Sequence, residues 1–175
     1  MRLMLLRHAK AEKAKPGMRD QERPLNGRGR GDTQTIGAYM ARHGLLPGFA
    51  VISPARRTRE TWERLLPELS RELAVDYEDR LYNAGADTIV TVIRETKAAV
   101  RALLLIGHNP GLHETARLLI ASGDVEARER LNEAMPTCGL AVIDFAGKDW
   151  RKLHAHAGRL EHFVTPRSLA EADKA

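Results

Sequence analysis

The sequence is poor in cysteine and aromatic residues and contains no long apolar run. Its 175 residues include one cysteine, and aromatic residues make up 5% of the chain. The lone Cys138 excludes an intramolecular disulfide, and the apolar stretch between Arg2 and Arg7 is too short for a signal peptide or a membrane span. We therefore expect a soluble protein in a reducing, cytoplasmic setting, with no membrane as a partner.

Negative charge is also in deficit. The 28 lysines and arginines outnumber the 23 aspartates and glutamates, which gives a formal net charge of +5, with arginine as the main source of the excess. Because the planar guanidinium matches carboxylate and phosphate better than an ammonium does, acidic substrates are favoured. A basic chain can also bind nucleic acid, but the few aromatic residues do not alternate with the arginines as stacking platforms would. We expect no nucleic-acid partner.

Several motifs for phosphate or nucleotide chemistry are missing. The sequence has no Walker A loop, and Cys138 is followed six positions later by Asp144, where a cysteine-based phosphatase needs arginine. The glycine-rich segment 27–31 follows no predicted strand and lacks the spacing of a dinucleotide fingerprint. We interpret this segment as the flexible start of a helix.

The distribution of apolar residues predicts an α/β domain. A chain of this length forms one domain and buries roughly 70% of its unfolded surface. Gly44 and Gly123 are placed as helix ends, and Asp87 and Asn109 as helix caps. The polar tail after Pro166 is expected to be frayed. The pattern predicts strands at residues 3–6, 51–52, 73–77, 103–106, 140–145 and 152–157, and helices at 28–44, 54–69, 87–99, 110–123 and 124–134.

Two histidines stand at the ends of predicted buried strands. Arg7 and His8 directly follow the apolar run 3–6, and His108 follows the run 103–106 after one glycine. In an open α/β sheet, ligands bind at the carboxyl ends of the strands. We therefore expect His8 and His108 to meet over one crevice, although they are far apart in the sequence.

A group of arginines follows the predicted strand 51–52. Arg56, Arg57 and Arg59 come shortly after Ser53, in the first turns of a predicted helix. Cations are disfavoured at the positive end of a helix dipole, so the arrangement is best explained by an anion bound there. Together with the histidine pair, this segment predicts one anion-sized site.

Metal binding has one possible set of ligands in the sequence. His154 and His156 would share one face of the predicted strand 152–157, with His162 as a third member. A polar stripe facing solvent explains the same spacing. We expect no metal site.

Three segments stand in a fixed order and spacing, namely Leu6-Arg7-His8, Ser53-Pro54-Ala55-Arg56-Arg57-Thr58-Arg59-Glu60-Thr61 and Gly107-His108-Asn109-Pro110-Gly111. They resemble the motifs of the histidine phosphatase superfamily, which includes the phosphoglycerate mutases. Ala9 departs from the pattern, because the best-known members have glycine after the motif histidine, and we interpret alanine there as a subgroup feature. The resemblance covers nearly the whole chain and is strongest to the SixA-type phosphohistidine phosphatases. The features that resemble the SixA type are the compact length and the segments Arg23-Pro24-Leu25-Asn26, Arg28-Gly29 and Met135-Pro136-Thr137.

The resemblance implies a phosphoglycerate mutase-like fold. A mostly parallel central sheet would be covered by helices on both faces, in a domain spanning residues 1–166 with a tail at 167–175. It further implies that His8, kept neutral because nearby arginines lower its pKa, attacks phosphorus, and that water then releases phosphate. No cofactor is required. The residues expected to hold the equatorial oxygens are Arg7, Arg57 and His108, and the further substrate contacts are Asn26, Ser53, Asn109 and Thr137.

The proton donor that an alcohol leaving group needs is not evident. Family members that act on such substrates use a carboxylate, but the residues available here, Asp20, Glu78, Asp79 and Asp87, have no distinguishing neighbour and are each better explained as a helix cap or a surface charge. A departing imidazole, whose conjugate acid has a pKa near ~6.5, needs less help than an alkoxide. The resemblance and the missing acid together favour phosphohistidine, in a signalling protein of the histidine-phosphotransfer type, as the substrate.

Two alternatives stay open at this point. One is a small-molecule phosphomonoesterase of the same superfamily, acting on a phosphorylated metabolite; the other is a basic binding module for phosphorylated partners or nucleic acid. The absence of a long insertion that would form a lid over a small substrate favours a protein substrate over the first. Release of phosphate without added metal would exclude the second.

Overall fold

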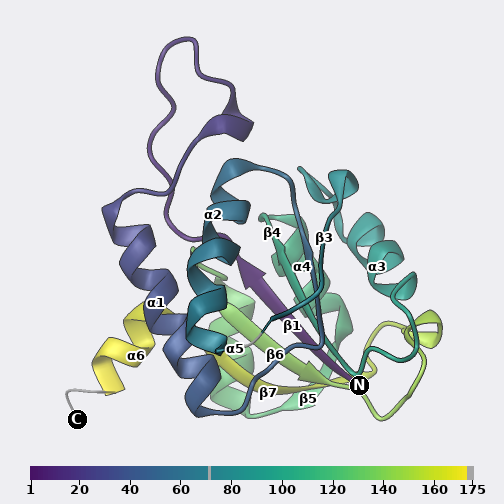
Figure 1. Cartoon of the computed structure of the whole chain (residues 1–175). Helices are drawn as coiled ribbons and strands as arrows, with labels where there is room; N and C mark the ends of the chain where they lie inside the picture. Colours follow the sequence, from purple (N-terminus) through teal and green to yellow (C-terminus); the bar gives the residue numbers. More distant parts are fainter. Residues whose placement is uncertain (71, 173–175) are drawn as a thin grey trace.

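A central sheet carries its strands in the order β3-β2-β4-β1-β6-β7-β5 (Figure 1). In this computed structural model, which describes residues 1–70 and 72–172, β6 runs antiparallel to β1 and β7, and the other neighbouring pairs are parallel. The sheet is therefore mixed but mostly parallel, as predicted. Its strands are β1 (Arg2–Arg7), β2 (Phe49–Ile52), β3 (Val75–Tyr77), β4 (Ala102–Gly107), β5 (Ile120–Gly123), β6 (Leu140–Asp144) and β7 (Gly158–Val164).

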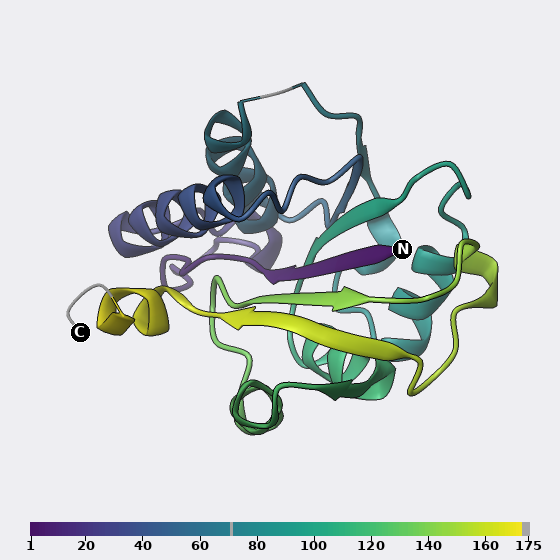
Figure 2. The same ribbon diagram turned by 90° about the horizontal axis from the view of Figure 1, so that it is seen from below.

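Helices cover both faces of the sheet, which confirms the predicted layering (Figure 2). One face carries α1 (Gly27–Arg42) and α2 (Arg56–Leu65), with α6 (Pro166–Ala172) beside α1. The other face carries α3 (Ala86–Arg94), α4 (Gly111–Leu119) and α5 (Val125–Glu133).

Strand β1 contributes to both hydrophobic cores. Successive residues of a strand point to opposite faces, so Leu3 and Leu5 pack with the α3 and α4 side, whereas Met4 and Leu6 pack with α1 and α2. All four side chains are fully buried. Because the sheet is covered on both faces, this strand reads as a continuous apolar run instead of an alternating one.

The far edge of the sheet differs from the prediction. Residues 120–123, which we assigned to the end of a helix, form β5, and the last strand lies at Gly158–Val164 instead of 152–157. In β7, Gly158 and Leu160 are buried and Arg159 and Glu161 are exposed, so the alternation that decides the strand lies after the predicted segment. The predicted segment begins at the last residue of a short 3-10 helix, Trp150–Lys152, and its histidines occupy the connection that follows.

Helix limits also differ in places. Helix α3 begins after Gly85 and ends at Arg94, so Asp87 lies in its first turn and does not cap it. The tail that we expected to be frayed forms α6 up to Ala172, and residues 173–175 lie outside the described part. Thr165 stabilises its start, because its Oγ1 accepts the Ser168 N–H at 3.1 Å. The limits of the domain stay a prediction.

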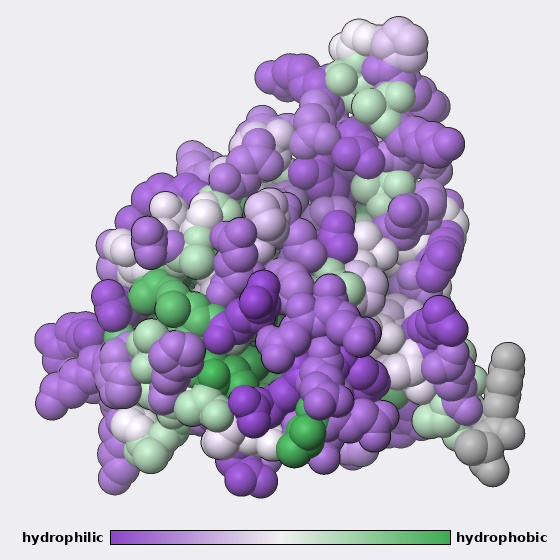
Figure 3. All heavy atoms as spheres, turned by 180° about the vertical axis from the view of Figure 1, so that it is seen from behind, coloured by the Kyte–Doolittle hydropathy of each residue, from purple (hydrophilic) through white to green (hydrophobic). Residues whose placement is uncertain are grey.

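One face of the molecule is largely polar. Figure 3 shows the face turned away from the reader in Figure 1, where apolar side chains gather in only small areas. Among the described residues, no helix is long and apolar enough to cross a membrane.

Candidate active site

Three neighbouring strands deliver polar residues to one edge of the sheet. His8, Ser53 and His108 directly follow β1, β2 and β4, and β4 lies between the other two strands. The His8 N–H donates to Gly107 O at 3.1 Å, and the Ser53 N–H donates to Ile106 O at 3.0 Å. The rings of His8 and His108 consequently lie 5.2 Å apart, centroid to centroid. The sequence pattern thus correctly placed the two histidines together.

His8 carries a free ring nitrogen. Its Nδ1 lies 2.8 Å from the carbonyl oxygen of Ala9, and a carbonyl oxygen can only accept, so Nδ1 holds the proton and Nε2 keeps its lone pair. Burial, with smaller contributions from His108, Arg57 and Arg7, lowers the pKa of His8 to about 3. His8 is therefore neutral near physiological pH and has the form that a nitrogen nucleophile needs.

The backbone after His8 is fixed by buried contacts. The Ala9 N–H donates to Thr61 Oγ1 at 3.0 Å, and Ala9 itself is fully buried in the core on the α1 and α2 side. A Cβ on Gly29 of α1 would collide with the backbone oxygen of Lys10. The small residues at both positions therefore let α1 and α2 approach the chain that carries His8.

His108 is held in one orientation by two neighbours. Its Nε2 lies 2.6 Å from Ser53 Oγ, and its Nδ1 lies 3.3 Å from Arg57 Nη2. Because a guanidinium group only donates, Nδ1 accepts and Nε2 donates to Ser53 in this arrangement. Burial, followed by the charge of Arg57, lowers the pKa of His108 to about 4. Ser53, predicted as a substrate contact, therefore positions His108.

Arg57 is the arginine of α2 that reaches the histidines. Its side chain is 6% exposed, whereas Arg56 pairs with Glu60 on the surface and Arg59 lies over the ring of Tyr77 at 5.1 Å. Among the three arginines that begin the helix, Arg57, which the resemblance assigned to the phosphate, is thus the one directed at the site.

Asp20 lies beside Arg57. Arg57 Nη1 donates to the Asp20 carbonyl oxygen at 2.8 Å, and Nη2 donates to Oδ2 at 3.0 Å. The carboxylate also accepts from Arg23 Nη1 at 2.9 Å and from the Tyr82 hydroxyl at 2.8 Å. These donors, with Arg23 first, lower the pKa of Asp20 to about 2. Asp20 is thus an ionised carboxylate at neutral pH and is unsuited to donate a proton.

Arg7 and Asn109 share an acceptor and leave buried polar atoms free. Arg7 Nη1 and Asn109 Nδ2 donate to the carbonyl oxygen of Met135, at 2.9 and 2.8 Å. Within the described ranges, Arg7 Nε and Asn109 Oδ1 are buried without a hydrogen-bond partner. Such groups are costly unless a ligand or water satisfies them, so both atoms are available to a bound molecule. Asn109 does not cap α4, since Pro110 holds that position.

The other predicted substrate contacts have different surroundings. Asn26 caps α1, because its Oδ1 accepts the Gly29 N–H at 2.8 Å, and this contact explains the residue without a substrate. Thr137 is half-buried in the loop before β6. The next residue, Cys138, donates its N–H to the carbonyl oxygens of Arg7 and His8 at 3.1 Å, which ties that loop to the site.

The remaining predicted acids lie outside this cluster of contacts. Glu78 pairs with Arg80 at 2.7 Å and caps a 3-10 helix, and hydrogen bonds from Arg80 lower its pKa. Asp79 and Asp87 are exposed.

Sequence reasoning missed Thr61, Tyr82 and the Met135 carbonyl as parts of the site. Thr61 is within the second motif, so its position carried a signal that was not used. Tyr82, whose ring stands edge-on to His108 at 5.7 Å, follows a short 3-10 helix and has no motif around it. A backbone carbonyl has no residue-type signature at all.

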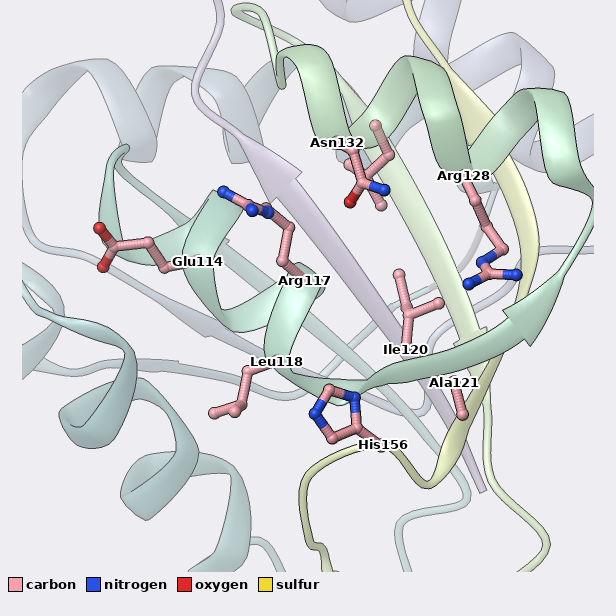
Figure 4. Close-up of a pocket in the computed structure, with 9 residues that line it drawn as sticks. Glu114, Arg117, Leu118, Ile120, Ala121, Arg128, Asn132 and His156 are labelled. Carbon is pink, nitrogen blue, oxygen red and sulfur yellow. The ribbon is translucent and has the colours of Figure 1, made fainter.

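A pocket of about 670 Å³ lies away from these residues, between α4, α5 and β5 (Figure 4). Its two arginines, Arg117 and Arg128, point in different directions and do not converge on one point. His156 lies at this pocket, and His162 bonds to Tyr39 at 2.8 Å. In the part of the chain that the structure describes, no three His, Cys, Asp or Glu side chains are grouped as metal ligands would be.

Comparisons with known proteins identify the family. A model of the histidine phosphatase superfamily (branch 1) matches residues 3–90, so the chain belongs to that superfamily, and its fold is phosphoglycerate mutase-like. The chain is 32% identical over 165 residues to an uncharacterized protein of Mycobacterium tuberculosis, and the alignment covers 93% of this chain and 100% of that protein.

Two solved structures of SixA proteins are similar. A candidate phosphohistidine phosphatase SixA from Agrobacterium tumefaciens has a TM-score of 0.81 and 32% identity, covering 94% of this chain and 97% of that one. The protein histidine phosphatase SixA complexed with tungstate has a TM-score of 0.78 and 18% identity, covering 97% and 99%. The second likeness supports the fold alone.

Proposed function

We propose that this protein is a metal-independent phosphatase that removes phosphate from phosphohistidine in a signalling protein, through a phosphohistidine intermediate on His8. The observation that carries the proposal is the state of His8, a neutral ring with Nδ1 bonded to Ala9 and Nε2 free. Arg7 and Arg57 lie near enough to His8 to lower its pKa, and their guanidinium groups are donors for a phosphoryl group, with His108 in contact with Arg57.

The reaction proceeds by two in-line displacements at phosphorus. In the first, His8 Nε2 forms a bond to phosphorus as the bond to the substrate imidazole breaks. Arg7 and Arg57 stabilise the charge on the equatorial oxygens. In the second, water attacks the phosphoryl group on His8, the nitrogen–phosphorus bond breaks, and inorganic phosphate leaves with both protons of the water.

Bound phosphate requires His108 to change its role. In the structure Nδ1 accepts from Arg57 and Nε2 donates to Ser53. The Ser53 hydroxyl can also donate, so it can satisfy Nε2 while the proton moves to Nδ1 and faces a phosphoryl oxygen. Ser53 thus lets His108 serve as a donor without leaving its ring nitrogens unpaired.

The ionised state of the carboxylate at the site supports phosphohistidine as the substrate class. Asp20, the carboxylate that contacts Arg57, has a pKa lowered to about 2 and is not a proton donor. An alkoxide leaving group requires such a donor at neutral pH, whereas imidazole leaves as a neutral amine when its distal nitrogen carries a proton. A phosphohistidine substrate therefore suits this site better than an alkyl phosphate does.

The test compares substrates with a chelator present. We expect the purified protein to release phosphate from a phosphohistidine peptide in EDTA, and to cleave an alkyl phosphate slowly. Glu78→Gln, Asp79→Asn and Asp87→Asn should each keep phosphohistidine hydrolysis within about tenfold of wild type. Fast alkyl cleavage that collapses in one of these variants would identify a proton donor and favour a small-molecule phosphomonoesterase.

A second measurement tests the covalent step. His8→Ala should abolish turnover and leave no labelled phosphoenzyme after an alkaline detergent quench, with an unchanged circular dichroism spectrum. His154→Ala, which alters an exposed histidine, is the matched control and should behave as wild type. Retained activity in His8→Ala would exclude His8 as the nucleophile, and absence of turnover in the wild type would favour a binding module.

A further inference from the structure

A negatively charged group beside a phosphate site needs an explanation. Asp20 lies in the long first loop, which rises above the carboxyl end of β1 (Figure 1). Its Oδ2 shares Arg57 Nη2 with His108, since that nitrogen lies 3.0 Å from Oδ2 and 3.3 Å from His108 Nδ1. An ionised carboxylate here repels a phosphoryl dianion, so its presence opposes binding of a phosphate ester with a neutral leaving group.

Asp20 is held in place and keeps room for one more donor. Its Oδ2 accepts from Arg57 and Tyr82, and its Oδ1 accepts from Arg23. A carboxylate offers about four lone-pair positions, so one position on Oδ1 is left. The Asp20 side chain is 47% exposed, whereas His108 is 5% exposed, so the carboxylate is accessible from solvent while it shares Arg57 with the buried histidine.

The leaving group of a phosphohistidine is the group that this carboxylate suits. Displacement is in line, so the substrate ring departs on the side of phosphorus opposite His8. When its distal nitrogen carries a proton, the bond to phosphorus breaks with its electron pair going to the ring, and neutral imidazole leaves. Without that proton the same step would expel an imidazolate anion, a far poorer leaving group.

On the basis of the proposed function, we infer that Asp20 is a specificity residue that accepts a hydrogen bond from the distal N–H of the substrate imidazolium. The carboxylate keeps that ring protonated until the bond to phosphorus breaks. The arrangement mirrors the one at His8, where the Ala9 carbonyl oxygen accepts from Nδ1–H. The phosphoryl group then passes between two imidazole rings that each carry a proton on the distal nitrogen, so no proton donor is needed.

Several charged groups face the substrate ring, and their effects oppose one another. The arginines and any positive charge on the histidines lower the pKa of the substrate imidazolium, and the carboxylate raises it. Removing the carboxylate therefore lowers the pKa of the substrate imidazolium and favours loss of the ring proton. The groups around the phosphoryl and ring positions are Arg7, His8, Arg57, His108 and Tyr82, and Arg23 donates to Oδ1 of Asp20.

The test uses Asp20→Asn, which removes the charge and keeps the size. Its control is Glu22→Gln in the same short helix, where the carboxylate pairs with Arg19 on the surface. For each protein, kcat/KM is measured against pH with a phosphohistidine peptide and with p-nitrophenyl phosphate, whose leaving group carries no protonated ring.

In Asp20→Asn, the kcat/KM for the peptide relative to p-nitrophenyl phosphate should fall about tenfold at alkaline pH. The pH at which peptide hydrolysis declines should move about one unit lower, since an adjacent carboxylate raises an imidazolium pKa by at least that much. Inorganic phosphate should inhibit the variant more strongly, because the repulsion is gone. Glu22→Gln should change none of these quantities.

Other outcomes separate this inference from the proposed function. Equal losses on both substrates, with the pH profile of the peptide unmoved, would show that Asp20 only organises Arg57 and would overturn the inference alone. A wild-type protein that cleaves p-nitrophenyl phosphate but not the peptide would overturn the proposed substrate class and this inference with it.

Discussion

Ser53 Oγ lies 2.6 Å from His108 Nε2, and both residues are buried at the ends of adjacent parallel strands. The register pairs Ile52 of β2 with Ile106 of β4, so the residues that follow these strands emerge side by side. The contact is therefore a direct consequence of sheet register. Because Nε2 is bonded to Ser53, Nδ1 is the ring nitrogen of His108 that contacts Arg57 and can contact a phosphoryl group.

Ser53→Ala should lower kcat/KM by about tenfold, since one buried hydrogen bond of about 1 kcal/mol or slightly more orients His108. Steady-state kinetics with p-nitrophenyl phosphate measures the loss. Ser122→Ala, at an exposed position of β5, is the matched control and should have no effect. An unchanged kcat/KM in Ser53→Ala would mean that packing alone orients the His108 ring.

His8 should remain neutral across the physiological range. Its pKa is lowered to about 3, mainly by burial, so protonation requires acid well below the ~6.5 of an unperturbed imidazole. Ring nitrogen shifts measured by NMR should show Nδ1 protonated and Nε2 unprotonated from about pH 8 down to about pH 5. A midpoint near 6.5, or the opposite tautomer, would contradict the geometry at Ala9.

Arg57→Ala should cost about 3 kcal/mol of transition-state stabilisation, or roughly a hundredfold in kcat/KM. Arg59→Ala is the matched control, because Arg59 lies two residues further along α2 and about 200° around the helix axis, over Tyr77. We expect that variant to stay within a few-fold of wild type. Similar losses in the two variants would show that the general positive charge of this helix, and not Arg57 itself, supports catalysis.

The parts of the fold that were predicted correctly depend on local signals. Apolar runs such as 3–6 and 103–106 identify buried strands, and the polar residues directly after them identify the edge where the site forms. The first loop lacks such signals, since residues 8–26 are polar and aperiodic. The contact between Asp20 and Arg57 joins that loop to α2, and only the assembled fold reveals it. Tyr82 reaches Asp20 in the same way, from a connection after β3.

The errors at the far edge of the sheet have a related cause. Leu118 to Gly123 reads as the end of an amphipathic helix, but Ile120 pairs with Gly158 in a strand that is chosen by tertiary contacts. A Cβ on Gly158 would collide with the side chain of Ile143, so this glycine allows β7 to lie close against its neighbours. Close approach of that kind leaves no periodic pattern in the sequence.

Alanine substitutions at two glycines of α1 should change the stability of the protein in opposite directions. A Cβ on Gly29 would collide with the backbone oxygen of Lys10, whereas a Cβ on Gly31 would meet nothing within 4 Å. Gly29→Ala should therefore destabilise the protein by about 1–3 kcal/mol through overpacking. Gly31→Ala should stabilise it by about 0.5–1 kcal/mol, because alanine costs less conformational entropy than glycine inside a helix.

Thermal unfolding measures both effects, since 1 kcal/mol corresponds to a Tm shift of about 2–4 °C for a domain of this size. Activity adds a second readout, because Lys10 lies two residues after His8 and the collision would displace the chain that fixes its ring. Gly29→Ala should lower kcat/KM at a temperature where the variant is still folded, and Gly31→Ala should leave it unchanged. If the two substitutions shift Tm in the same direction, α1 does not pack against the chain after His8 as closely as the structure indicates.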